Sequence, residues 1–187
     1  MKKLFTIIFI FISVLGYSQI SLDTLILNEV NEYRKSMNVK ELKWDEQLQE
    51  GAEHHSTYLL YINFQTIENI ATTNMCAEGQ YKLDLVRGHE ERAKTTGIEN
   101  LSFYQRSKRY NITRENVMTI LGYMDTDLAA FSIVDAWKKS PSHNETLLHS
   151  DMRFCGISTK LVKIKDIGSK FGMNMFNVYI VSTMTFK

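Results

Sequence analysis

The sequence predicts an α+β domain in which helices come first and strands come last. Between residues 23 and 59, apolar residues recur every three or four positions, which is the spacing of amphipathic helices. Over 155–161 and again over 178–186 they alternate with other residues, as in half-buried strands. This order favours a layered α+β domain over a doubly wound parallel sheet.

Two helices are expected near the start of the chain. The first covers residues 23–37, where Asp23 can cap the beginning and Asn38 can end the helix. Asp45 can cap the second. We expect His55, on the apolar stripe of this second helix, to be a hydrogen-bonded core residue and not a ligand. The stripe consists of Leu48, Ala52, His55 and Leu59.

The middle of the chain is harder to interpret. Residues 63–97 mix polar and small residues without periodicity, which predicts a surface loop with one short helix. We expect a short strand at 98–104 and a helix capped by Thr113. A fourth helix should begin at Asp127 and end before Pro141, because the residue before a proline disfavours helical geometry. The third helix would carry Val117, Ile120, Leu121 and Met124 on its apolar face.

The N-terminus has the pattern of an export signal. Two lysines precede an apolar run at 4–15, and the small residues Gly16 and Ser18 fit a cleavage site after Ser18. A membrane anchor is the alternative, but the run is short for a bilayer. We therefore expect a signal peptide at 1–18. A single secreted domain at 19–187, with no transmembrane segment, should follow.

Composition limits the partners that we expect. The chain carries 22 lysine and arginine residues against 21 aspartate and glutamate residues, which argues against a nucleic-acid or anionic-membrane partner. We expect a monomer.

The two cysteines, Cys76 and Cys155, could pair in an exported protein, or both could be buried free thiols.

Two short segments place histidines at the edges of structured elements. His89 precedes Glu99-Asn100-Leu101, and His143 ends a Ser-Pro-Ser-His turn; neither is a standard zinc or nucleophile motif. In this order, after a helical pair, they resemble the CAP superfamily (cysteine-rich secretory proteins, antigen 5 and pathogenesis-related 1) in its bacterial form. The resemblance covers about residues 24–187, with two long inserts at 63–88 and 104–125. The other matching segments are Tyr33-Arg34, Leu42-Lys43-Trp44-Asp45, Val134-Asp135-Ala136-Trp137 and Phe154-Cys155-Gly156-Ile157.

The resemblance implies a fold and a cavity. The fold is an α-β-α sandwich, in which helices flank a central antiparallel sheet. The cavity is lined by two histidines and two acidic residues, and His89, Glu99 and His143 match three of these places. Ser140 stands where longer members carry the second glutamate. Glu145 is the candidate substitute.

Two imidazoles and a carboxylate are the donor types of an open zinc site, so His89 and His143 are candidate zinc ligands. The spacing lacks a His-x-x-x-His pair, and we therefore expect opportunistic metal uptake more than a resident ion. Each residue also has a simpler interpretation. His89 can be read as a solvated loop histidine, His143 as the C-cap of the fourth helix, and Glu99 as a strand-edge carboxylate.

The leading functional hypothesis is a secreted, non-enzymatic binding or interaction domain. The resemblance implies a lipid-like or small apolar ligand, or another extracellular molecule. A metal-assisted or histidine-dependent hydrolase of the peptidase type, using His89, His143 and Glu99, is the alternative. Ser142 adjoins His143, but no nucleophile-elbow motif surrounds it. A purely structural role is the third hypothesis.

Overall fold

The computed structural model of the chain describes residues 21–72, 87–91, 98–166 and 175–187. The predicted signal peptide and Cys76 lie outside these residues. The described helices are α1 (Leu22–Ser36), α2 (Glu46–Thr72), α3 (Phe103–Tyr110), the short 3-10 helix η1 (Thr126–Leu128), α4 (Ala129–Lys139) and α5 (Pro141–Leu148). The strands are β1 (Lys43–Trp44), β2 (Arg114–Asp125), β3 (Phe154–Asp166) and β4 (Met175–Phe186).

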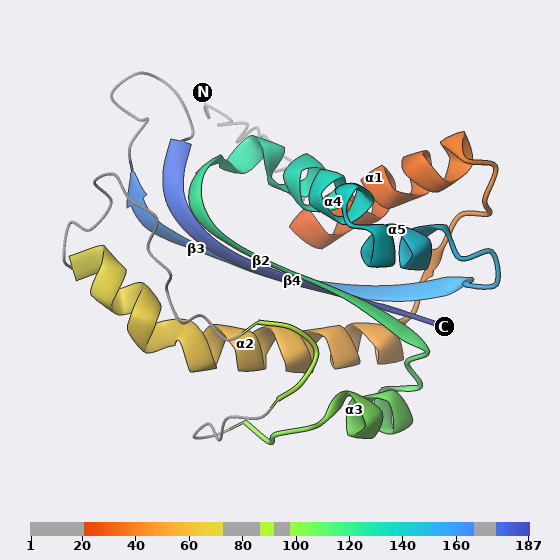
Figure 1. Cartoon of the computed structure of the whole chain (residues 1–187), viewed down its shortest axis with the longest axis horizontal. Coiled ribbons are helices and arrows are strands. Elements are labelled where there is room, and N and C mark those ends of the chain that lie inside the picture. The colour runs from red at the N-terminus through yellow and green to blue at the C-terminus, as the bar shows by residue number, and fades with distance from the viewer. Residues whose placement is uncertain (1–20, 73–86, 92–97, 167–174) are drawn as a thin grey trace, which may run out of the picture.

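The strands form one sheet between two layers of helices. The strand order is β1-β3-β4-β2, in which β1 is parallel to β3 and the other pairs are antiparallel. Helices α1, α4 and α5 lie on one face of the sheet, and α2 and α3 lie on the other (Figure 1). This is the predicted α-β-α sandwich, with β2 as an edge strand.

Alternation along the central strand β4 builds both apolar layers. Ile180 and Met184 are buried in the core beneath α1 and α4, whereas Tyr179 and Val181 are buried in a second cluster with residues of α2. Successive side chains of a strand point to opposite faces, so one strand can supply two cores. The predicted strand at 178–186 is confirmed, and so is the one at 155–161.

The helical pair is also confirmed, with changes at its ends. The hydroxyl of Ser21, and not the carboxylate of Asp23, accepts the capping hydrogen bond from the Thr24 N–H at 3.2 Å. Asn38 follows α1 with a left-handed φ of 57°, as a helix-ending residue should. Asp45 caps α2 through a 3.0 Å hydrogen bond from the Leu48 N–H. Helix α2 continues to Thr72, so the loop predicted from residue 63 is wrong over 63–72.

The helix predicted from Thr113 is wrong, because these residues form the strand β2. Every residue of β2 pairs with β4, from Arg114 opposite Phe186 to Asp125 opposite Met175. A short apolar run fits either helical or strand periodicity, and the neighbouring strand decides between them. The strand predicted at 98–104 is wrong too, because α3 begins at Phe103 with a capping box between Ser102 and Gln105.

The chain's only proline both ends one helix and begins another. Helix α4 ends at Lys139, as predicted, and Pro141 is the first residue of α5, where a missing N–H has no cost. His143 therefore lies in the first turn of α5, and its interpretation as a C-cap of α4 is wrong. The buried Arg34 of α1 holds the end of α5 through a hydrogen bond to the carbonyl of Leu147.

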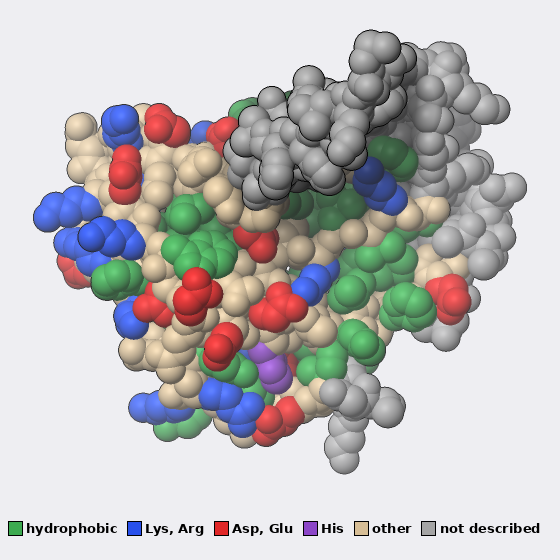
Figure 2. Space-filling view, turned by 180° about the vertical axis from the view of Figure 1, so that it is seen from behind, with side chains coloured by type: hydrophobic (Ala, Val, Ile, Leu, Met, Phe, Trp, Pro, Cys, Tyr) green, Lys and Arg blue, Asp and Glu red, His purple; other side chains and the backbone are tan. Residues whose placement is uncertain are grey.

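Two further expectations concern the surface and the cysteines. Positive and negative side chains are interspersed on the face seen in Figure 2, in agreement with the near-balanced charge. None of the described helices is long and apolar enough to cross a membrane. Cys155 is buried, and burial raises the pKa of its thiol to about 12. Its pairing with Cys76, which lies outside the described residues, stays a prediction.

Candidate functional site

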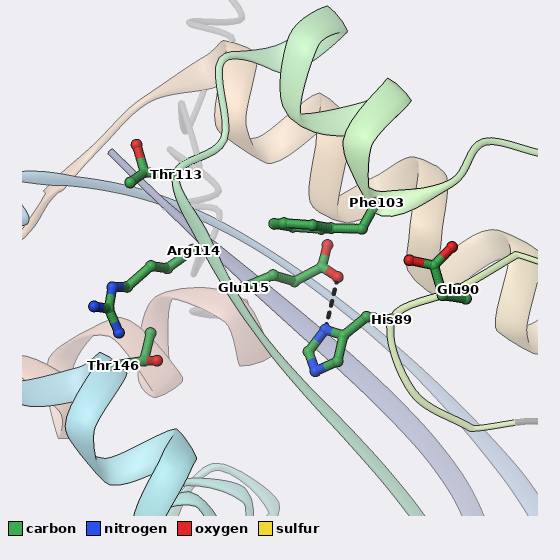
Figure 3. Close-up of a pocket in the computed structure, with 7 residues that line it drawn as sticks. All are labelled: His89, Glu90, Phe103, Thr113, Arg114, Glu115 and Thr146. Atoms are coloured by element: carbon green, nitrogen blue, oxygen red, sulfur yellow. Dashed lines mark hydrogen bonds and ion pairs between the residues drawn. The ribbon is translucent and has the colours of Figure 1, made fainter.

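A pocket lies where the edge strand β2 begins. Its volume is about 360 Å³. Figure 3 shows Phe103 of α3 on one side of β2 and Thr146 of α5 on the other, so both helical layers contribute walls. The lining residues are His89, Glu90, Phe103, Thr113, Arg114, Glu115 and Thr146.

A hydrogen bond between His89 and Glu115 forms one wall of the pocket (Figure 3). The His89 Nδ1 lies 3.0 Å from the Glu115 Oε1. The Glu115 side chain is 1% exposed, whereas that of His89 is 43% exposed. Burial alone would raise the pKa of Glu115, but the hydrogen bond with His89 and the charge of Arg106 lower it. The pocket therefore carries a buried carboxylate and an accessible imidazole.

Arg106 joins this pair to a second buried carboxylate. Its Nη2 donates to the Glu115 Oε1 at 2.9 Å and to the carbonyl of His89 at 2.7 Å. Its Nη1 donates to the Glu91 Oε1 and to the carbonyl of Leu101, both at 2.9 Å. The guanidinium is fully buried, so these bonds connect α3, β2 and the segment 87–91 without competition from water.

Glu91 accepts hydrogen bonds from several donors. The His55 Nδ1 lies 3.0 Å from its Oε1, the His54 Nε2 lies 3.3 Å from its Oε2, and the Leu101 N–H donates to Oε2 at 2.7 Å. Burial by itself raises the pKa of this carboxyl. These bonds and the charge of Arg106 outweigh burial and lower the pKa to about 2.

We expect Glu91 to stabilise the fold above pH 4.5 and to lose that contribution as the pH falls toward 2. Its folded pKa of about 2 lies below the ordinary 4.5, so the unfolded chain takes up the proton first. The contribution is at most about 3 kcal/mol. Urea unfolding of the wild type and of Glu91→Gln between pH 2.5 and pH 7 measures it. The exposed Glu50→Gln is the control and should keep the wild-type pH dependence, whereas an unchanged dependence in Glu91→Gln would contradict the expectation.

The structure brings the two predicted histidines into one neighbourhood. The carbonyl of His143 accepts a hydrogen bond from the Asn116 Nδ2 at 3.1 Å, and this places His143 beside β2. Its Nδ1 is buried and has no hydrogen-bond partner among the described residues. Burial, and then the charge of His89, lower the pKa of His143 and favour its neutral form.

The two predicted carboxylates lie elsewhere. The Glu99 side chain is 60% exposed and pairs with Arg109 at 2.7 Å, and the Glu145 side chain is 70% exposed and pairs with Arg114 at 3.1 Å. Only Glu145 is connected to the pocket, through Arg114. Glu91 and Glu115 are the carboxylates beside the histidines. Sequence reasoning missed Glu115 because its segment was assigned to a helix.

The donor set of this pocket does not fit a three-ligand zinc site. Among the residues that the structure describes, no three histidine, cysteine or acidic side chains are arranged to hold a metal ion. The buried oxygens nearest to His89 and His55 already accept from Arg106, and a cation there would have to displace the guanidinium. We therefore derive no chemistry from a metal at this site.

The fold and the pocket define an α-β-α sandwich domain with a histidine–carboxylate site at the edge of its sheet. The model of the cysteine-rich secretory protein family (CAP) matches residues 27–163, and the chain belongs to this family. None of the curated proteins compared with the chain matches it.

Two solved structures are similar in fold. One is an extracellular protein containing an SCP domain from Bacillus anthracis, with 13% identity and a TM-score of 0.50, covering 89% of this chain and 40% of that chain. The other is an outer surface protein from Borrelia burgdorferi, with 19% identity and a TM-score of 0.48, covering 87% of this chain and 90% of that chain.

Proposed function

We propose that this protein is an exported, non-enzymatic binding domain whose ligand places a polar group in the pocket beside β2. One observation carries the proposal. Glu115 lines the pocket, yet its Oε2 is buried without a hydrogen-bond partner among the described residues. A buried carboxylate oxygen without a donor costs free energy, and a ligand with an N–H or O–H group would supply that donor.

The size and lining of the pocket restrict the ligand. Its 360 Å³ lies near the lower end of the range of about 300–1,000 Å³ for small-molecule sites. Phe103 is the apolar member of a lining that is otherwise polar or charged. The small volume suits a group the size of a lipid headgroup better than a long acyl chain. A lipid-like ligand would keep its chain outside.

Export and a monomeric state are parts of the same proposal. The N-terminal pattern at 1–18 supports export. The similar structure from Bacillus anthracis is described as that of an extracellular protein, which agrees with export.

We expect Glu115→Gln to weaken ligand binding at least tenfold without unfolding the domain. Glutamine keeps an acceptor for His89 and Arg106 but removes the negative charge at the unpartnered oxygen. Native mass spectrometry of the exported protein, first as purified and then with dihexanoylphosphatidylethanolamine, measures the occupancy. Phosphoethanolamine without acyl chains shows whether the headgroup suffices. Glu50→Gln is the exposed control, and equal occupancy in all forms, or none in any, would contradict the proposal.

The His89–Glu115 pair favours hydrolysis as a second candidate. A histidine oriented by a buried carboxylate can act as a general base toward water. Arg106 shares that carboxylate, however, and a neutralised carboxylate supports an imidazolium less well. Turnover of a peptide or of a nitrophenyl ester, measured in the wild type and in His89→Gln, separates the two candidates. We expect no turnover above background; turnover that is lost in His89→Gln would establish hydrolysis instead.

A further inference from the structure

We infer that His55 is a proton-dependent clamp that holds the wall of the pocket, so that the pocket is intact when His55 is protonated and opens as the pH rises. His55 comes from α2 and is completely buried. Its partners belong to the segment 87–91, which supplies His89 and Glu90 to the pocket.

Hydrogen-bond geometry is the first argument. The Nδ1 of His55 lies 3.0 Å from the Glu91 Oε1, and its Nε2 lies 2.8 Å from the carbonyl oxygen of Gly88. Both oxygens are acceptors, the first because Glu91 stays ionised. A neutral imidazole has one N–H, whereas an imidazolium has two. Both bonds therefore form only when His55 carries a second proton.

Charge balance is the second argument. Glu91 and Glu115 are buried carboxylates, and both accept from the same guanidinium of Arg106. Arg106 balances one of the two negative charges, and a protonated His55 or a protonated His89, whose Nδ1 lies 3.0 Å from Glu115, can balance the other. Of these two histidines, His55 is the one that is fully buried, and its second proton also satisfies both of its hydrogen bonds.

His55 faces titratable groups from each element around it. Its own helix contributes His54 and Tyr58, whose ring is stacked on that of His55 with centroids 6.2 Å apart. The segment 87–91 contributes Glu91, and Arg106 and Glu115 come from α3 and β2. The His54 Nε2 faces Glu91 and the carbonyl of Glu99, and a neutral ring protonated at Nε2 serves both contacts. Of the two neighbouring histidines, only His55 needs hydrogen on both ring nitrogens to make its hydrogen bonds.

The clamp acts on the pocket through a short turn. Gly88 has a φ of 94°, a left-handed conformation that suits glycine, and it presents its carbonyl to His55. Gly88 and Glu91 flank the lining residues His89 and Glu90. Loss of the proton from His55 would leave a nitrogen lone pair facing an oxygen at one end of this segment. The control of ligand binding by this clamp rests on the proposed function, whereas the protonation state of His55 does not.

The protonation state can be measured directly. Nitrogen-15 NMR of histidine-labelled wild type, with His55 assigned by comparison with His55→Gln, reports both ring nitrogens. At about pH 6 we expect both to carry hydrogen, with the single-proton form appearing as the pH rises. One neutral tautomer across the whole range would overturn the inference.

Hydrogen exchange measures the opening. The Leu101 amide donates to the Glu91 Oε2, so its exchange reports on this segment. After correction for intrinsic exchange, we expect its opening equilibrium to rise about tenfold per pH unit over the pH range in which opening releases the proton of His55. The slope should vanish in His55→Gln and persist in the matched His54→Gln. The amide of Tyr179, in the central strand, should show no slope, and a common slope at both amides would overturn the local clamp.

The readouts separate this inference from the proposed function. One outcome would be that His55 is protonated and that opening at the Leu101 amide depends on pH, while the amount of bound phospholipid in native mass spectrometry does not change with pH. In that case the clamp stands, and the pocket is not the ligand site. If His55 is neutral and the slope is absent, the clamp is overturned whatever the pocket binds.

Discussion

Replacing Arg106 with methionine should lower the free energy of unfolding by about 3–5 kcal/mol at pH 7. The substitution removes the guanidinium that both buried carboxylates, Glu91 and Glu115, accept from. Methionine fills much of the volume but leaves two charges without their shared partner, and the carbonyls of His89 and Leu101 lose a donor as well. Urea unfolding at pH 7 measures the loss.

Arg109, one turn further along α3, is the matched control. Its side chain is 45% exposed and pairs with the exposed Glu99. Arg109→Met should therefore cost less than about 1 kcal/mol. The Arg106→Met loss should shrink toward pH 5, because an unpaired buried carboxyl can then take up a proton. Equal losses for the two variants would mean that the buried network contributes little to stability.

Gly156→Ala should cost about 3 kcal/mol or more, because helix α2 lies directly on the backbone of β3. A Cβ at Gly156 would overlap the backbone of Leu48 and Gln49. The opposite residue, Thr185, donates to the carbonyl of Leu48 at 2.8 Å, which shows how close the helix lies to the sheet. Backbone cannot rotate away as a side chain can, so the whole helix would have to move. Thermal and urea unfolding measure the effect.

Gly51→Ala tests whether backbone contact is the reason. A Cβ at Gly51 would lie 2.8 Å from the Cδ1 of Ile112 and 2.9 Å from the Cβ of Tyr110, which are side-chain atoms. The Cδ1 of Ile112 can move by side-chain rotation, whereas the Cβ of Tyr110 moves only with its backbone, which lies in the short helix α3. In addition, alanine favours a helix over glycine by about 1 kcal/mol. We expect a clearly smaller loss than for Gly156→Ala. A larger loss at Gly51 would contradict the explanation.

Local patterns predicted those elements whose apolar residues follow one clear period. The helix at 23–37 and the strand at 178–186 have one period each, and both form where expected. The apolar residues of the segment 114–125 fit the spacing of a helix as well as that of a strand. Its pairing with β4, far along the chain, decided that it is a strand. A single-sequence pattern contains no information about that partner.

The same limit explains the site. His89 and His143 could be chosen from their motifs, and the structure places both near β2. Glu115 could not be chosen, because it became a neighbour of His89 only when its strand joined the sheet. Glu91 adjoins Glu90 in sequence, and nothing local tells which of the two is buried. Burial and the approach of Arg106 decided that.

The sequence by itself determined the α+β class, the helical pair, the closing strands and the two histidines, because each depends on local periodicity, capping or a motif. The tertiary structure alone decided which carboxylates face the histidines and that Arg106 joins them. It also decided that His55 lies between two acceptors. Those properties depend on contacts between residues far apart in the chain, where burial sets the strength of each charge and hydrogen bond.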